Sequence, residues 1–425
     1  MTTIVGVLNS RGVAFAADSA ATHTTKDKKY KITNHTNKIF TLSKYHPVGV
    51  AIYENLDFEG IPWETIIKMF RNNLKDKKYN TLDQYIKEFW AYIKKECLIL
   101  SVNLQQANLN MFLRSYYQEV HSQTEMAVGK YSVANAVQYY QHYISVLDNR
   151  KSTYQRQIQA EDFKTYDLKQ FRKYAKLSVD KILTNDLADP NCPVEFRKKF
   201  EESAHAFLCV STPTYFSNYT GLVFWGYGDS ELFPSYQEYR VYYAIDNHIK
   251  YNVIDKYAVT GLGCAAVKPF AQRDVASSII WAVEDTLKST FYENYKKSIE
   301  VFRDDIIRQM TNSGASQQLI DILNGLDANR YAINYRDSMN KYIEEHFINP
   351  LTGTIAYLSK EDLADMAESI VRMTCIKRRI TSTEETVGGP VDVAVVTKGD
   401  GFIWMHRKHY FDPQLNQQFF ERYNK

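Results

Sequence analysis

Cysteine is scarce in this 425-residue chain and is poorly placed for a structural framework. The five cysteines are scattered, odd in number and without any C-x-x-C spacing, which argues against a disulfide scaffold or a zinc site. The ten histidines form no H-x-x-x-H or H-E-x-x-H arrangement, so we expect no metal site and no cofactor. This cysteine usage favours a reducing compartment, and we expect a cytoplasmic protein.

Long apolar runs and a strong charge bias are also missing. The sequence has no apolar run long enough to cross a membrane, so no membrane partner is expected. Lysine and arginine number 52 against 49 aspartates and glutamates, and a net charge of +3 gives no reason to expect a nucleic-acid partner. With 44% hydrophobic residues, the composition is that of a globular protein.

Glycine and proline are few, 17 and 10, and are scarcest over residues 76–211. That stretch is rich in tyrosine, lysine and glutamine, which predicts long helices. The aromatic fraction of 14% is high, and its simplest use is the packing of such helices.

Strand patterns flank the helical stretch. Strands are expected over 3–8, 13–18, 38–42, 48–53, 221–226, 239–245 and 256–260, with a closing hairpin over 391–397 and 401–404. The polar, basic stretch 23–37 is expected to be an exposed loop. Amphipathic helices are expected to begin near 60–64, to span 273–290 and to begin at 359–362.

This order of elements predicts an α+β layered protein, because antiparallel hairpins alternate with blocks of helices. We expect a core interrupted by two helical insertions. Its segments are 1–75 (core), 76–211 (helical insertion), 212–290 (core strands and helix), 291–357 (second helical insertion) and 358–425 (core helix and strands).

The chain begins Met1-Thr2-Thr3, and a small second residue permits removal of Met1. Thr2 would then carry both a hydroxyl nucleophile and an α-amine whose ordinary pKa of about 7.7–8.0 suits a general base. The alternative is that Thr2 only begins an edge strand.

Four stretches, in a fixed order, give the sequence a resemblance to a known family. They are Thr2–Val7, Gly12–Thr22, Asn37–Phe40 and Gly388–Gly401. Together they resemble the proteasome β-subunit family and its bacterial relatives, which are N-terminal nucleophile (Ntn) hydrolases, over roughly half of the chain. The resemblance implies a four-layer αββα Ntn-hydrolase sandwich, here with two helical insertions, and a homo-oligomeric ring.

The resemblance assigns catalytic roles to four residues. Thr2 is the nucleophile, and Lys38 is a cation that lowers the pKa of the Thr2 amine and favours the developing alkoxide. Asp18 holds Lys38 charged and oriented, and Glu384 keeps an acidic role near Thr2. The alternatives for Lys38 and Asp18 are a strand lysine with its ammonium in solvent and a turn aspartate.

The resemblance also assigns a substrate site. The backbone of Thr22 pairs with substrate, which adds as a strand, and the N–H of Glu54 lies at the oxyanion position. Ala21, Thr36 and Ile52 line the pocket for the residue before the scissile bond, and this neutral lining suggests uncharged apolar substrates.

Three supporting positions depart from the family pattern. Glu54 stands in place of a glycine, Leu262 in place of a serine, and Val387 cannot supply the hydroxyl of the last motif. Loss of these groups is expected to slow catalysis or narrow the substrates more than abolish activity.

The sequence therefore predicts a threonine-type peptidase that hydrolyses peptide or amide bonds through an acyl-Thr2 intermediate. Two alternatives stay open: a non-peptidase Ntn amidohydrolase, and a catalytically degenerate scaffold that binds partners. The expected partners are a polypeptide substrate and further copies of the chain, with an ATPase or other protein as a further candidate.

Overall fold

The computed structural model describes residues 2–24, 29–96, 98–211, 215, 218–381 and 387–424. The chain divides into two compact units, each assembled from segments that are distant in sequence. The first unit consists of Met1–Ile39, Leu232–Pro234 and Val259–Lys425, and the second of Phe40–Glu231 and Ser235–Ala258. The boundary after Ile39 falls inside the segment 1–75 that the sequence suggested as one piece of core.

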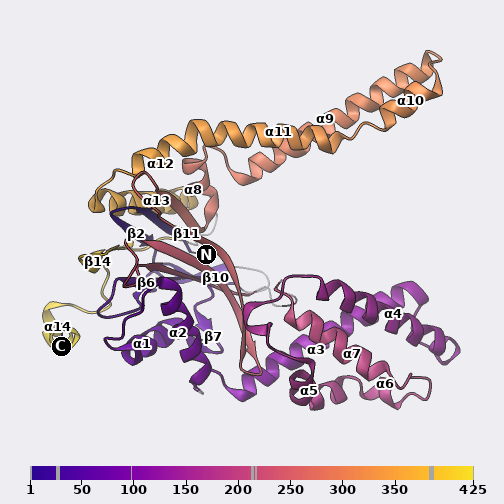
Figure 1. Ribbon diagram of the computed structural model, residues 1–425, viewed down its shortest axis with the longest axis horizontal. Helices are drawn as coiled ribbons and strands as arrows, with labels where there is room; N and C mark the ends of the chain where they lie inside the picture. The colour runs from indigo at the N-terminus through magenta and orange to yellow at the C-terminus, as the bar shows by residue number, and fades with distance from the viewer. Residues whose placement is uncertain are drawn as a thin grey trace. The chain divides into compact units, whose positions relative to one another are not determined.

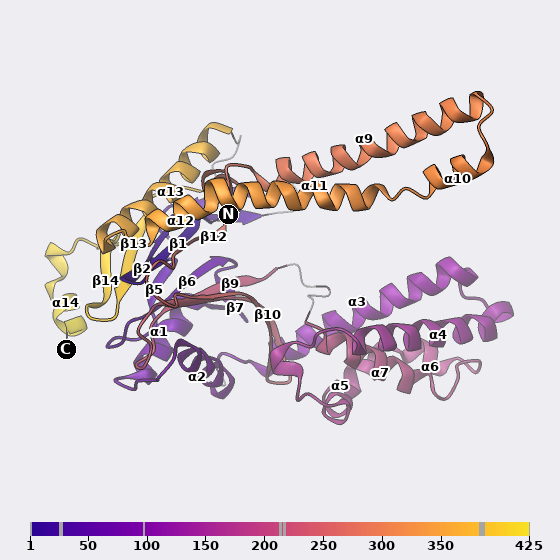
Figure 2. The ribbon, with the colours of Figure 1, turned by 45° about the horizontal axis from the view of Figure 1, so that its top comes forward.

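A five-stranded antiparallel sheet is the centre of the first unit, in the order β12–β1–β2–β13–β14. Its strands are β1 (Ile4–Asn9), β2 (Gly12–Ala17), β12 (Ala266–Ala271), β13 (Asp392–Thr397) and β14 (Gly401–His406). β1 and β2 form the predicted hairpin, with Asn9 opposite Gly12. β13 pairs with the other side of β2 and places Asp392 opposite Ala17, so strands from both ends of the sequence are neighbours (Figure 2).

Two helices pack on this sheet, α8 (Arg273–Ile280) and α13 (Lys360–Thr381). Alternate residues of the strands join them in one buried apolar cluster, as the two-residue period of a strand requires. The cluster includes Val5, Val7, Ala14, Ala16, Ala276, Leu363, Ala367, Ile370, Val393 and Val395. α13 begins and runs as the sequence predicted.

The single helix predicted over 273–290 is wrong, because the structure has two helices there. α8 ends at Ile280 and α9 (Asp285–Asn312) begins after a break in which Ala282 has φ 59°. A left-handed residue cannot belong to a continuous α-helix. The apolar spacing continues across the break, which is why the sequence pattern joins the two.

α9 continues into a helical hairpin that covers much of the predicted second insertion. α9 runs beside α11 (Ala328–Ile343), and α10 (Gln317–Asn324), which comes between them in the sequence, lies at the far end of the hairpin (Figures 1 and 2). We call α9, α10 and α11 the arm. The π-helical turn η3 (Glu344–Ile348) and α12 (Asn349–Ile355) follow the arm.

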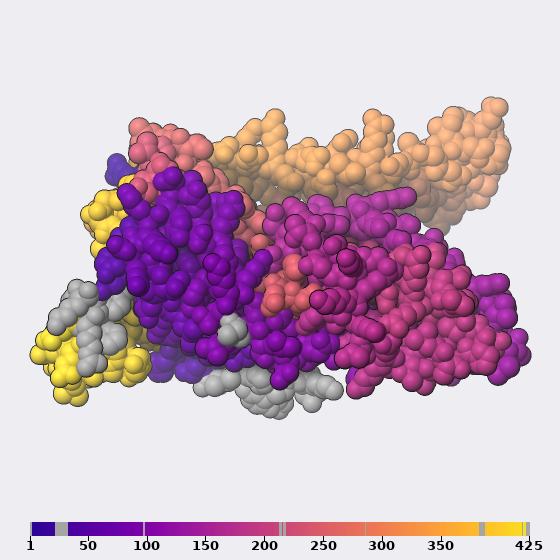
Figure 3. Space-filling model, turned by 60° about the horizontal axis from the view of Figure 1, so that its bottom comes forward, coloured from indigo at the N-terminus to yellow at the C-terminus, as the bar shows by residue number. Residues whose placement is uncertain are grey.

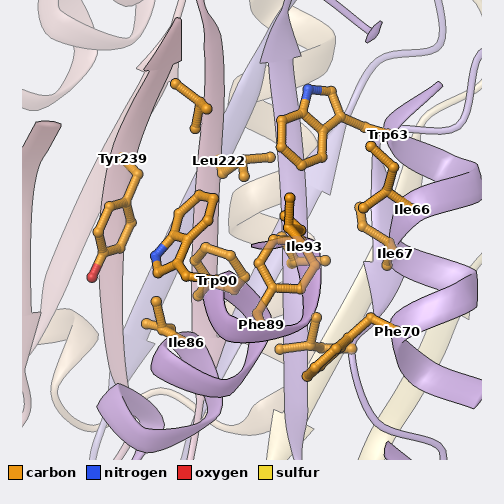
Figure 4. Close-up of a cluster of buried hydrophobic side chains, with 14 of the residues drawn as sticks. Trp63, Ile66, Ile67, Phe70, Ile86, Phe89, Trp90, Ile93, Leu222 and Tyr239 are labelled. Carbon is orange, nitrogen blue, oxygen red and sulfur yellow. The ribbon is translucent and has the colours of Figure 1, made fainter. Parts of the chain in front are cut away.

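The second unit contains a five-stranded sheet in the order β11–β10–β9–β6–β5. Its strands are β5 (Ile39–Thr41), β6 (Val48–Glu54), β9 (Thr220–Gly226), β10 (Ser235–Ile245) and β11 (His248–Ala258). The amphipathic helices α1 (Trp63–Leu74) and α2 (Leu82–Lys95) pack on one face through the large side chains of Figure 4. The indole of Trp63 donates to Thr220 Oγ1 at 2.8 Å, so this core also satisfies its buried polar group.

Most of the predicted first insertion is a helical bundle in the second unit, of which Figure 3 shows one face in magenta. Its elements are α3 (Val102–Val128), η1 (Val133–Asn135), α4 (Ala136–Gln155), η2 (Glu161–Phe163), α5 (Leu168–Ile182), α6 (Thr184–Ala188) and α7 (Phe196–Cys209). Buried tyrosines such as Tyr116, Tyr139 and Tyr143 form much of its core. α2 lies within the predicted insertion 76–211 but belongs to the core of the sheet.

Two short hairpins and a C-terminal helix complete the description. β3 (Ala21–Thr24) pairs with β4 (Lys29–Thr33), and β7 (Asp57–Phe58) pairs with β8 (Ile61–Pro62). The loop expected over 23–37 is therefore partly a strand pair. Its lysines suggested an exposed loop, but its threonines and tyrosine favour strands. η4 (Gln414–Asn416) and α14 (Gln417–Asn424) follow β14.

Antiparallel sheets and blocks of helices agree with the α+β class predicted from the sequence. In the part of the chain that the structure describes, no helix combines the length and apolar character needed to cross a bilayer.

Candidate active site

Asp18 lies at the centre of a buried hydrogen-bond cage just beyond the end of β2. Its Oδ1 accepts from the backbone N–H of Thr3 at 2.8 Å and from Lys38 Nζ at 2.7 Å. Its Oδ2 accepts from the backbone N–H groups of Ala20 at 3.2 Å and Gly388 at 3.0 Å. Two oxygens that only accept are thus matched by four donors, which fixes the carboxylate in one orientation. We call this arrangement the Asp18 cage.

Lys38 immediately precedes β5, and its side chain is 1% exposed. Burial lowers the pKa of its ammonium below the ordinary value, and the ion pair with Asp18 opposes that lowering. A strand lysine with its charge in solvent, the alternative that the sequence left open, does not describe this side chain. The pair is instead a buried ion pair in which hydrogen bonds from the backbone hold the carboxylate.

Thr2 is held at the start of β1, next to the Asp18 cage. Its neighbour Thr3 donates its N–H to the Asp18 carboxylate, and the Thr3 carbonyl accepts from the Asp18 N–H at 3.1 Å. Thr2 itself is 4% exposed. The Thr3 hydroxyl is also buried and has no hydrogen-bond partner among the described residues. The backbone beside Thr2 is therefore fixed by two hydrogen bonds, and Met1 lies outside the described residues.

A glycine pair before β13 forms another wall of the site. Gly389 has φ 80°, and a Cβ there would lie 2.7 Å from the carbonyl oxygen of Asn34, so only glycine fits without movement of the backbone. Ser19 donates its N–H to the Gly388 carbonyl at 3.0 Å and its hydroxyl to the Pro390 carbonyl at 2.5 Å. The strand-turn that the sequence singled out thus contacts the segment after Asp18 directly.

Three of the predicted substrate-binding residues lie in the first unit, close to this segment. Ala21 and Thr22 begin β3, and the N–H of Thr36 donates to the Ser19 carbonyl at 3.0 Å. The side chain of Thr22, and Glu384 as a whole, lie outside the described residues.

The other two substrate-site residues, Ile52 and Glu54, lie in β6 of the second unit. Ile52 is 2% exposed and belongs to the apolar cluster with α1 and α2. Glu54 is exposed at the end of the strand and has φ 64°, a conformation that favours glycine. The backbone at this position therefore has the geometry expected of a glycine although the residue is a glutamate.

The two other departures from the family pattern differ in their surroundings. Leu262 is 86% exposed in the loop after β11, whereas Val387 is 1% exposed beside the glycine pair. Neither side chain offers a hydroxyl, so no polar support comes from these two positions.

The sequence analysis missed a second buried ion pair, between Lys408 and Asp392. The Lys408 ammonium bonds to Asp392 Oδ2, and its backbone N–H donates to Oδ1 at 2.9 Å. The charge of Lys408 is a further, smaller cause that lowers the pKa of Lys38. Asp392 stands in a stretch that the sequence had flagged, but the return of the chain after β14 brings Lys408 to it, and no local pattern reports that.

Cys375, on α13, also interacts electrostatically with the Asp18–Lys38 pair. Burial, assisted by the negative charge of Asp18, raises the pKa of its thiol to about 11. A neutral thiol is a poor nucleophile and a poor metal ligand. Within the described ranges, no group of three or more histidine, cysteine, aspartate or glutamate side chains is placed to hold a metal ion.

No protein-family model matches the chain, and no curated protein matches its sequence significantly.

Proposed function

We propose that this chain is an N-terminal threonine hydrolase that cleaves peptide or amide bonds through an acyl-Thr2 intermediate. The observation that carries the proposal is the Asp18 cage, in which one carboxylate oxygen joins the Lys38 ammonium to the backbone of Thr3. A buried cation is thereby held within two hydrogen bonds of the residue that follows Thr2. Such an arrangement suits activation of a hydroxyl nucleophile.

The reaction begins once Met1 is removed and the α-amine of Thr2 is free. The amine, directly or through one water, takes the proton of the Thr2 hydroxyl as Oγ attacks the substrate carbonyl. The tetrahedral intermediate collapses to an ester on Thr2, and the departing amine receives the proton. Water then hydrolyses the ester, with the Thr2 amine as base, and restores the hydroxyl.

Two groups stabilise charge in this scheme. Lys38 disfavours protonation of the nearby Thr2 amine and favours the developing alkoxide. The backbone N–H of Glu54 donates to the oxyanion. The φ of 64° at Glu54 supports this role, since a glycine-like backbone is kept there despite its steric cost.

The same proposal extends to architecture and partners. Each unit has one five-stranded sheet with helices packed against it, and we propose that the two form the four-layer αββα sandwich of the family that the sequence resembles. A polypeptide substrate, assembly into a homo-oligomeric ring and a cytoplasmic location belong to this proposal, as does an ATPase or other protein as a candidate partner.

A second candidate function is a scaffold that has lost catalytic power. The exposed Leu262 and the buried Val387 favour it, because both positions lack the hydroxyl that would support the nucleophile. An amidohydrolase that acts on a small amide differs from the main proposal only in its substrate.

Intact mass of the purified protein, before and after treatment with a β-lactone or epoxyketone probe, tests the proposal. We expect loss of the mass of Met1 and one adduct, located on Thr2 by peptide mapping. Thr2→Ala should abolish both the adduct and turnover of a peptide panel. A small-amide substrate without peptide turnover would point to the amidohydrolase, and a retained Met1 would favour the scaffold.

Thr3→Val is the matched control for Thr2→Ala. It removes a neighbouring buried hydroxyl that has no partner among the described residues, and it leaves the Thr3 N–H bonded to Asp18. The adduct should persist in Thr3→Val. If the adduct were lost in Thr3→Val but kept in Thr2→Ala, the nucleophile would be Thr3 and the assignment of Thr2 would be wrong.

A further inference from the structure

The arm exposes an unusual amount of apolar side chain for a long helical hairpin. None of the side chains described for α9, residues 286–312, is buried. Leu287, Phe291 and Phe302 are 47%, 43% and 68% exposed. Helices of this kind obtain most of their stability from packing an apolar face, so α9 lacks the packing that a helix of its length requires.

The exposed apolar residues of the arm are regularly spaced along its helices. The spacings between Leu287, Phe291 and Phe302 place all three on one side of α9. On α10, Leu319 and Ile322 follow the i, i+3 spacing and are 48% and 66% exposed. We call these five residues the arm stripe. α11 packs beside the stripe, where the rings of Tyr295 and Tyr335 stack at 4.2 Å, and it leaves each stripe residue at least 43% exposed.

The charges of the arm indicate what kind of partner fits. Residues 285–343 hold eight lysines and arginines and eight aspartates and glutamates, so the arm has no net charge. Several of these charges pair locally, for example Arg303 with Asp304 at 2.9 Å. An arm without net charge has no long-range attraction for a strongly acidic or basic partner, and balanced charges of both signs suit contact with an identical surface.

We propose that the arm stripe binds the arm of a second copy of this chain, so that two hairpins form a four-helix bundle across a two-fold axis. Closed two-fold pairing is the commonest assembly of identical chains. Helices of this length, each with a contact strip about 10 Å wide, offer on the order of 800 Å² per copy, as much as a standard interface buries. The two phenylalanines are the anchors, since large aromatic residues dominate such contacts.

This inference goes beyond the proposed hydrolase and does not depend on it. The test is the mass of the full chain by sedimentation velocity over a range of concentrations. Phe291→Glu with Phe302→Glu should halve the assembled mass and weaken association by about 100-fold or more, since it buries charge in the contact. Thr290→Glu with Thr311→Glu adds the same charge to polar positions of α9 and should leave the mass unchanged.

Hydrogen exchange of the native chain at several concentrations shows whether the contact lies on α9. In the native chain, amides of 286–312 should exchange faster on dilution, while those of β1 and β2 should not change. A native chain that is monomeric at tens of micromolar would overturn the proposal. So would an assembly whose mass is the same in both double variants, because its contacts would then lie outside the arm. The Thr2 adduct should form in every variant if the hydrolase proposal holds, and its absence throughout would count against the hydrolase alone.

Discussion

Lys38 in the first unit and Lys250 in the second are both buried, yet their surroundings are opposite in kind. Lys38 meets a carboxylate, and the same carboxylate oxygen binds the backbone beside Thr2. Among the described residues, Lys250 has neutral hydrogen-bond partners: its Nζ donates to the carbonyls of Leu208, at 2.6 Å, and Val210.

The role of Lys250 is explained by the end of α7. Carbonyls in the last turn of a helix have no partner within the helix, and a lysine ammonium commonly supplies one. The ring of Phe163, 5.2 Å from Nζ, covers the ammonium. Burial lowers the pKa of Lys250 to about 7, and none of the described carboxylates pairs with the ammonium to offset the cost of the charge.

The comparison teaches that a buried lysine with a lowered pKa does not by itself mark a site. Lys250 serves the architecture of one helix end. Lys38 differs because its partner, Asp18, also accepts a hydrogen bond from the Thr3 N–H. The Lys38 ammonium is therefore held close to the backbone beside Thr2. The two lysines are therefore distinguished by their hydrogen-bond partners and not by their burial.

The largest effect is expected from Lys38→Met. Activity should fall by about a thousandfold if Lys38 activates Thr2, within the range of such catalytic groups. Unfolding should also become easier by about 3–5 kcal/mol, because the Asp18 carboxylate stays buried without its cation. Initial rates and urea unfolding check both expectations.

The double variant Asp18→Asn with Lys38→Met sharpens this result. It removes the buried charge as well as the cation, so much of the lost stability should return while activity stays low. If activity returned along with stability, Lys38 would have only a structural role, like Lys250.

An intermediate effect is expected from Lys250→Met, and it should depend on pH. Between the folded pKa of about 7 and the ordinary value of 10.5, the unfolded state holds a proton that the folded state lacks. The free energy of unfolding of the native chain should therefore rise with pH in this window, by about 1.4 kcal/mol per unit at most. The variant lacks this contribution.

Urea unfolding of both proteins at pH 7 and pH 9 measures the difference. The destabilisation caused by Lys250→Met should be larger at pH 9, while turnover at pH 7 should match the native chain. A destabilisation that is constant or smaller at pH 9 would mean that Lys250 is charged throughout this range.

The smallest effect is expected from Glu54→Gly, which asks whether the second unit takes part in the reaction. Relief of the left-handed conformation, partly offset by greater freedom of the unfolded chain, should stabilise by about 1 kcal/mol or less. If the Glu54 N–H is the oxyanion donor, removal of the carboxylate should also raise kcat, by less than about tenfold. Lys75→Gly is the control, since Lys75 has φ 52° at the end of α1 and only its stability should change.

Elements held by local contacts could be predicted from the sequence. The β1–β2 hairpin follows from two strand patterns around the turn at Asn9–Gly12, and α1 follows from its apolar face. The resemblance supplied Thr2, Asp18 and Lys38 as one site, and the structure places Asp18 and Lys38 in contact next to Thr3.

Features that depend on distant contacts could not be predicted. Lys408 reaches Asp392 only because β14 returns beside β13. The division into two units cuts through two of the predicted segments, 1–75 and 212–290, since strands pair by position in the sheet rather than by order in the sequence. The break at Ala282 is likewise invisible, because the apolar period passes through it without interruption.

The positions of its donors in the sequence also determine when the Asp18 cage can form during synthesis of the chain. Its donors come from Thr3, Ala20, Lys38 and Gly388, so the cage cannot close until Gly388 has been made. At about 5–20 residues per second, roughly 20 to 80 s separate synthesis of its first and last donors. A nascent chain can lose Met1 long before that, and during this interval an exposed terminal threonine would lack the fixed carboxylate that orients Lys38. The order of synthesis thus delays the proposed chemistry until Gly388 has been added to the chain.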